Sequence, residues 1–214
     1  MNKLRKLFYQ RLVMETFRLK AKGRCNFPLT RLDHILDLPP HDLLMIGDGS
    51  GSGNWSIGAG WACVTIERDT DKRFLTWGGY SRGPVLLAEL MAYLQALMDY
   101  EFVHGHELRQ KLRRSYRIVV LTDNDTLVKQ HHQIATGANV ANVTAPLWAA
   151  MNQLVTSKGI LITFYHIPRI SICLNDVVDQ ISRTVRETVQ DDDKMRAFCV
   201  KNYGSDLYQL NPIS

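Results

Sequence analysis

The order of β-rich and helical segments restricts most strongly how this 214-residue chain can fold. Three β-rich segments come first, separated by turn-forming residues, at 43–47, 56–67 and 72–80. A helical segment opens at Pro84, and β-rich segments at 117–122 and 159–166 then alternate with helical ones. Strands joined by short turns pair antiparallel, whereas strands joined through a helix pair in parallel. We therefore predict an α/β domain with a five-stranded mixed sheet, an antiparallel meander followed by parallel crossovers, flanked by helices.

Positive charge is concentrated at the N-terminal end of the chain. The net charge is +5, but residues 1–31 hold nine Lys and Arg against Glu15, so the rest of the chain is mildly acidic. Apolar residues at helical spacing predict an amphipathic helix over residues 2–22. This helix either docks on the body of the protein or binds nucleic-acid phosphates. The cations that we expect to bind phosphate are Lys3, Arg5, Lys6 and Arg11.

These patterns divide the chain into three parts. Residues 1–41 form a basic helical extension with a Pro-containing connector, residues 42–190 the α/β domain, and residues 191–214 a tail. The longest apolar runs are a few residues long, far short of the ~20 that span a bilayer, so we expect no membrane contact. Four widely spaced cysteines and no signal peptide favour a cytoplasmic protein, with a mitochondrial presequence as the alternative. The sequence predicts no particular protein partner.

Four acidic residues occupy positions where chemistry could use them. Asp48 and Asp123 each follow a β-rich segment, Glu89 lies in the first turns of the helix after the meander, and Asp179 lies one turn into the last helix. Singly, such residues serve as turn or helix-cap residues. Together they would repel one another unless cations lay between them. Two Mg²⁺ ions held by such carboxylates can catalyse phosphodiester hydrolysis.

Short motifs around these acids resemble those of the ribonuclease H family, in the family's order. They are Asp48-Gly49-Ser50, Gly58–Ala62, Ala88–Ala92, Leu121–Asn124, and His166–Arg169 followed by Asn175–Asp179. The resemblance implies an RNase H-like fold and an endonuclease that hydrolyses the RNA strand of RNA/DNA hybrids with two Mg²⁺, or Mn²⁺, ions.

Specific roles follow from the resemblance. Asp48 would bridge both ions, Glu89 and Asp123 would complete one site, and Asp179 would help to hold the other. Residues beside these acids are expected to contact nucleic acid, and they are Gly49, Ser50 and Asn124.

Two positions depart from the family pattern. Pro84-Val85-Leu86 replaces a polar Thr-Asn-Asn-type stretch that contacts the nucleic-acid backbone, and Arg169 occupies the place of a histidine. Arg169 can bind phosphate but cannot exchange a proton near neutral pH. Trp55 follows the first motif and could stack on a sugar or base. Two alternatives therefore stay open: an RNase H-like nuclease acting on another nucleic acid, and a non-catalytic RNase H-like module that binds nucleic acid.

Overall fold

The computed structural model describes residues 38–51, 59–80, 84–140, 143–167, 173–188 and 208–209. The predicted N-terminal helix and most of the C-terminal tail lie outside these residues, and so do Trp55 and Arg169. Within the described ranges, none of the helices combines the length and the apolar character that crossing a bilayer requires.

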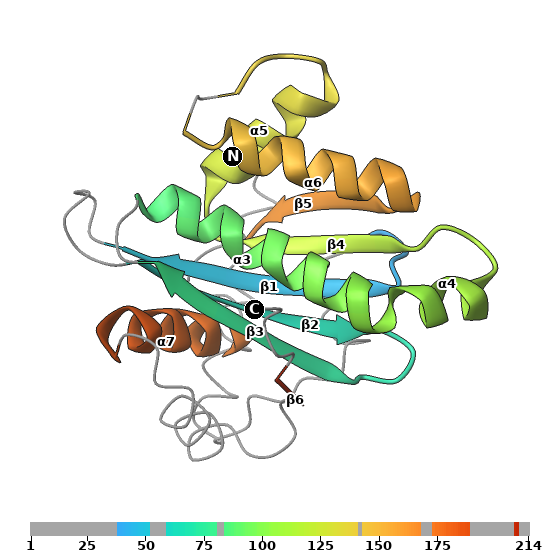
Figure 1. Ribbon diagram of the computed structural model, residues 1–214, viewed down its shortest axis with the longest axis horizontal. Coiled ribbons are helices and arrows are strands. Elements are labelled where there is room, and N and C mark those ends of the chain that lie inside the picture. The colour runs from blue at the N-terminus through green and yellow to red at the C-terminus, as the bar shows by residue number, and fades with distance from the viewer. Residues whose placement is uncertain are drawn as a thin grey trace, which may run out of the picture.

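A mixed sheet forms the centre of the domain, with strand order β5-β4-β1-β2-β3-β6 (Figure 1). The strands are β1 (Leu43–Ser50), β2 (Ala59–Glu67), β3 (Arg73–Tyr80), β4 (Arg117–Thr122), β5 (Leu161–His166) and the two-residue β6 (Tyr208–Gln209). The β1–β2 and β2–β3 pairs are antiparallel, whereas β1–β4 and β4–β5 are parallel. The predicted five-stranded mixed sheet is thus confirmed, and β6 adds a short parallel pairing to β3.

Helices cover both faces of the sheet (Figure 1). They are α3 (Val85–Tyr100), the π-helix η1 (Glu101–Gly105), α4 (His106–Leu112), α5 (Asp125–Ala135), α6 (Ala145–Lys158) and α7 (Cys173–Thr188). One apolar cluster lies between α7 and the sheet, and a second joins the opposite face to α3, α5 and α6. Because β1 is central and covered on both faces, all eight of its residues are buried.

Local sequence explains where the helices begin and end. Pro84 precedes α3 in an extended conformation, which suits a residue that cannot donate a backbone hydrogen bond. The side chain of Asn124 caps α5 by accepting a hydrogen bond from the Thr126 backbone N–H at 3.0 Å. Helix α6 ends at Gly159, whose φ of +63° is left-handed and favours glycine.

Candidate active site

The ends of two neighbouring parallel strands bring the first two acidic residues together. The register of the β1–β4 pair ends with Ile46 opposite Leu121. Asp48 lies two residues further along β1, and Asp123 lies two residues past Leu121, directly after β4, so both reach the same edge of the sheet. This edge, at the carboxyl ends of parallel strands, is where α/β folds place their binding sites.

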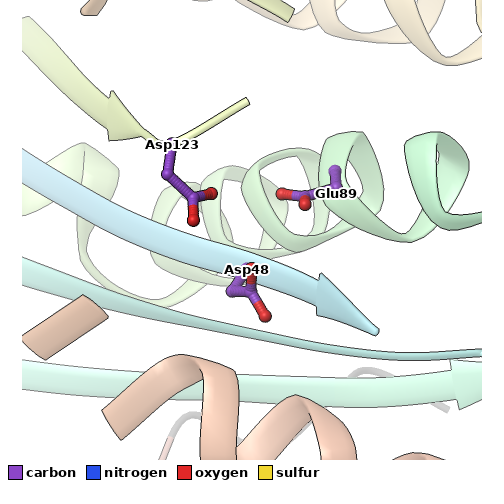
Figure 2. A group of neighbouring side chains, drawn as sticks. All are labelled: Asp48, Glu89 and Asp123. Atoms are coloured by element: carbon purple, nitrogen blue, oxygen red, sulfur yellow. The ribbon is translucent and has the colours of Figure 1, made fainter. Parts of the chain in front are cut away.

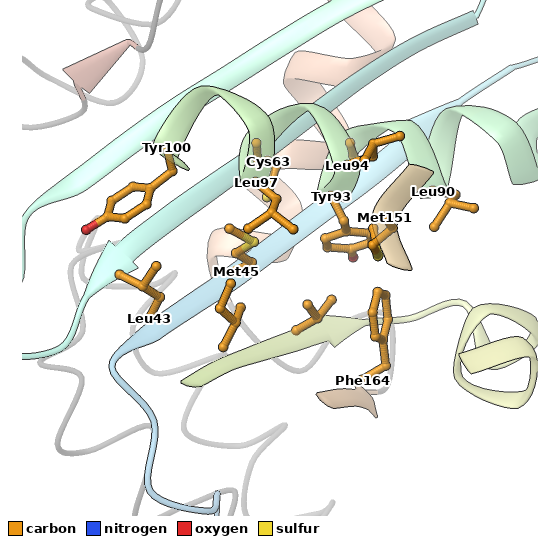
Figure 3. Close-up of a cluster of buried hydrophobic side chains, with 14 of the residues drawn as sticks. Leu43, Met45, Cys63, Leu90, Tyr93, Leu94, Leu97, Tyr100, Met151 and Phe164 are labelled. Atoms are coloured by element: carbon orange, nitrogen blue, oxygen red, sulfur yellow. The ribbon is translucent and has the colours of Figure 1, made fainter. Parts of the chain in front are cut away.

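Tyr93 joins the two strands at the point where their ladder ends. Its ring is fully buried in the apolar cluster between α3 and the sheet (Figure 3). Its hydroxyl lies 2.7 Å from the Gly47 carbonyl oxygen and 3.0 Å from that of Leu121, so its single hydrogen can be donated to either. A Cβ at Gly47 would come within 2.8 Å of the ring, so the ring needs glycine there. Tyr93 therefore holds the strand ends that carry Asp48 and Asp123.

Glu89 reaches the same place because α3 lies very close to the end of β1. A Cβ at Gly49 would be 2.2 Å from the backbone nitrogen of Glu89, so only glycine permits this approach. The Glu89 carboxylate accepts hydrogen bonds from the backbone N–H of Gly49 and from the side chain of Asn124. The glycine of the first motif thus lets Glu89 turn toward the strand ends.

Asp48, Glu89 and Asp123 form one carboxylate cluster. One oxygen from each lies within 4.8 Å of the others. Figure 2 shows the carboxylates of Asp123 and Glu89 facing each other beside the part of β1 that carries Asp48. Asp48 and Glu89 are buried, and Asp123 is half-buried. Burial, followed by the charges of Asp48 and Asp123, raises the pKa of Glu89 well above its usual range.

The cluster has the composition of a site for a hard divalent cation. Oε2 of Glu89 is buried, and within the described part of the chain no group hydrogen-bonds it. A buried, unsatisfied carboxylate oxygen is costly unless a cation or donor meets it. Oxygen ligands are those that Mg²⁺ and Mn²⁺ prefer. The three residues therefore fit a metal ion.

Asp179 lies beside this cluster without belonging to it. The group of carboxylates close enough to share an ion, as found among the described residues, contains the other three acids only. The Asp179 carboxylate instead forms a 3.0 Å ion pair with Arg183, one turn further along α7. Asn175, from the first turn of the same helix, approaches Asp123 Oδ2 at 3.5 Å. The role of Asp179 at a second ion stays a prediction.

The residues predicted to contact nucleic acid lie in different parts of the chain. Gly49 and Ser50 are the last two residues of β1, with Ser50 buried, and Asn124 caps α5. Trp55, Arg169 and the four cations near the N-terminus lie outside the described residues.

Sequence reasoning missed two buried polar residues at the site, Tyr93 and Ser182. Tyr93 follows Glu89 by four residues, so helical spacing could have placed it one turn further on the same face. The Ser182 hydroxyl lies 2.9 Å from Asp48 Oδ2, although the two residues are 134 positions apart in the chain. Nothing in the local sequence marks that serine.

Comparisons with solved structures agree with this fold. LC11-RNase H1, solved in complex with an RNA/DNA hybrid, matches with a TM-score of 0.56 and 19% identity over 68% of this chain and 97% of its own. A second structure of LC11-RNase H1, isolated from compost by a metagenomic approach, has a TM-score of 0.56 and 17% identity over 70% and 98%.

A viral enzyme extends the likeness. The prototype foamy virus protease-reverse transcriptase (CSH mutant) has a TM-score of 0.51 and 14% identity over 72% of this chain and 22% of its own. The chain has the RNase H-like fold. No family model and no curated protein matches its sequence, so it is the structural similarity that shows the RNase H-like fold.

Proposed function

We propose that this RNase H-like chain is a metal-dependent endonuclease that hydrolyses the RNA strand of RNA/DNA hybrids. The observation that carries the proposal is the convergence of Asp48, Glu89 and Asp123 within 4.8 Å at the carboxyl ends of β1 and β4. LC11-RNase H1, which shares the fold, was solved with a hybrid bound.

Each acidic residue has a proposed place in the metal site. Asp48, Glu89 and Asp123 would hold one divalent cation, and Asp48 together with Asp179 would hold a second. The cations, when bound, supply activation of a water nucleophile and stabilisation of the charge on the leaving 3′-oxygen. Arg183 pairs with Asp179 and compensates its charge before a cation arrives.

The chain's own residues prepare this site. The Gly49 N–H and the Asn124 side chain hold the Glu89 carboxylate, whose buried Oε2 has no hydrogen-bond partner among the described residues. Tyr93 keeps the strand ends together, and burial excludes water from Glu89 and Asp48. A site held in this way needs little reorganisation when charge develops during the reaction.

Contacts with the nucleic acid are proposed for residues around and beyond the cluster. They are Gly49, Ser50, Trp55, Asn124 and Arg169, together with Lys3, Arg5, Lys6 and Arg11 in the extension. We expect Arg169→Ala to weaken binding, cleavage or both, and an unchanged affinity and rate would remove Arg169 from this set.

A second candidate function is an RNase H-like nuclease acting on another nucleic acid. Pro84 lacks a backbone N–H and precedes α3 without a side-chain cap, and apolar Val85 and Leu86 follow it. These side chains cannot hydrogen-bond a 2′-hydroxyl, which is the group that distinguishes RNA from DNA. This observation favours relaxed substrate selectivity.

Cleavage of end-labelled duplexes tests both candidates. RNA/DNA hybrid, RNA/RNA, DNA/DNA and single strands are incubated with Mg²⁺ or Mn²⁺ and with wild type, Asp48→Asn or Asp125→Asn. Asp125 is a matched control, since it is exposed, paired with Lys129 and outside the cluster. We expect wild type and Asp125→Asn to cut only the RNA strand of the hybrid, and Asp48→Asn to cut nothing.

The other outcomes discriminate among the alternatives. Asp48-dependent cutting of another substrate would favour the second candidate. No cutting, together with salt-sensitive binding, would favour a non-catalytic module.

A further inference from the structure

Ser182 places a buried hydroxyl between α7 and the carboxylate cluster. Its side chain is fully buried, and its Oγ donates to Asp48 Oδ2 at 2.9 Å. The same Oγ lies 2.9 Å from the backbone carbonyl oxygen of Asp179, one turn earlier in α7. Ser182 thus joins α7 to Asp48 of the cluster, while Asn175 of the same helix approaches Asp123.

The close packing of α7 on β2 makes this contact geometrically possible. Gly60 lies opposite Ser50 in the β1–β2 ladder, beside the end of β1. A Cβ at Gly60 would be 2.3 Å from the Ser182 carbonyl oxygen and 2.7 Å from the Arg186 backbone nitrogen. Glycine therefore lets the helix lie against the sheet, and a side chain as short as serine then reaches Asp48.

The hydroxyl has two acceptors but only one hydrogen to donate. Hydrogen bonds to an ionised carboxylate are roughly twice as strong as those to a neutral acceptor. The Asp48 carboxylate is therefore the preferred acceptor, and the Asp179 carbonyl keeps the hydroxyl within reach when that bond is broken. A bond of this kind restricts rotation of the Asp48 carboxylate.

We propose that Ser182 is a positioning residue that holds the Asp48 carboxylate in place for divalent cations and ties it to the turn of α7 that carries Asp179. The proposal rests on the function proposed above. Hydrogen-bond partners of metal ligands typically change metal affinity or activity by about 10–100-fold when they are removed. Ser182 touches no reacting group, so its effect is exerted through Asp48.

Metal binding without nucleic acid separates this role from catalysis. Titration calorimetry measures the affinity of the full-length protein for Mg²⁺ and Mn²⁺, and thermal melting in EDTA confirms folding. The variants are Ser182→Ala, which suits a helix, and Ser182→Cys, which keeps the shape of the side chain but donates weakly. Thr184→Ala is the matched control, because the Thr184 hydroxyl, on the same helix, bonds the Gln180 carbonyl at 2.8 Å and lies exposed at that bond.

We expect Ser182→Ala and Ser182→Cys to weaken Mg²⁺ binding by about tenfold or more, while Thr184→Ala stays within about twofold of wild type. In cleavage assays the Mg²⁺ concentration for half-maximal rate should rise in the same proportion, with kcat recovering at saturating metal. If Ser182→Ala melts far below wild type, the metal affinity of Ser182→Cys decides whether the positioning role holds.

Two negative results have different meanings. Wild-type affinity in a folded Ser182 variant would overturn the positioning role and leave the proposed nuclease intact. No binding of either metal by wild type would overturn the proposed function, and the positioning role with it.

Discussion

Replacing Asp48 with Asn should stabilise the protein in EDTA and abolish its stabilisation by Mg²⁺. Without cations, the negative charge of Asp48 is held beside Asp123 and Glu89 at the cost of folding free energy. Asn removes that charge but keeps a carbonyl oxygen that can still accept the Ser182 hydrogen bond. The substitution thus isolates the electrostatic repulsion.

The size of the effect follows from the spacing of the carboxylates. At an effective dielectric constant of about 20, two unit charges 4.8 Å apart repel by about 3.5 kcal/mol. Burial and the neighbouring charges raise the pKa of Glu89, which weakens its repulsion of Asp48. Solvent at half-buried Asp123 weakens the repulsion between Asp123 and Asp48, so we expect Asp48→Asn to raise the free energy of unfolding by about 2 kcal/mol. For a chain of this length that corresponds to a rise in Tm of about 4–8 °C.

Magnesium should reverse the order of the melting temperatures of wild type and Asp48→Asn. A ligand present at a thousandfold excess over its Kd stabilises the folded state by about 4.1 kcal/mol. Wild type should gain this amount and Asp48→Asn very little, so wild type should then melt at the higher temperature. Differential scanning calorimetry in EDTA and in a series of Mg²⁺ concentrations measures both effects.

Asp125→Asn serves as the control, because it removes an exposed acid paired with Lys129. We expect a shift in its Tm of less than about 2 °C in EDTA, as for an ordinary surface pair, and an undiminished response to Mg²⁺. A fall in the Tm of Asp48→Asn in EDTA, or a full Mg²⁺ response in that variant, would refute the electrostatic reasoning.

Three further predictions concern neighbouring features. Because the pKa of Glu89 is raised from its ordinary 4.5, this carboxyl ionises in the unfolded chain before it does in the folded protein as pH rises. Stability in EDTA should therefore fall above pH 4.5 and level off above the folded pKa. Glu89→Gln should flatten this fall, as measured by thermal melts at successive pH values. Tyr93→Phe keeps the ring but removes the hydroxyl that lies within hydrogen-bond distance of the Gly47 and Leu121 carbonyl oxygens, which should cost about 1–3 kcal/mol in urea unfolding, and an unchanged midpoint would contradict the bridging role. Replacing the four N-terminal cations by Ala should reduce the salt dependence of hybrid binding by about one unit of slope per lost phosphate contact, as measured by fluorescence anisotropy. These cations are Lys3, Arg5, Lys6 and Arg11.

Local patterning predicted the elements that depend on neighbours in the chain. The fourth strand has the predicted bounds, Arg117–Thr122, because a short β-rich run lies between polar segments. Asp48, Glu89 and Asp123 lie together, as the order of the elements and the motif resemblance indicated, whereas Asp179 lies outside the cluster that the described residues form. Strand bounds follow from local patterns, but grouping the acids also needed the order of the motifs.

Some features of α3 could not be read in this way. Apolar residues at helical spacing along α3 include Met98, but this side chain is 44% exposed, whereas Tyr93 is fully buried. The helix also continues through η1 into α4. Buried Glu101, the first residue of η1, bonds Arg109 and Tyr116. Helical spacing identifies a face, but the sheet beneath decides how far along that face burial extends.

Residue order was thus enough to indicate a five-stranded mixed sheet, and the resemblance of short motifs to the ribonuclease H family indicated the fold and the acids that lie together. Three-dimensional packing was needed for the approach of α3 to Gly49, the approach of α7 to Gly60, and the hydrogen bond from Ser182 to Asp48. The physical reason is that hydrogen bonds and charge repulsion depend on distances of a few ångströms between segments far apart in the chain. Those distances exist only after the helices have packed against the sheet.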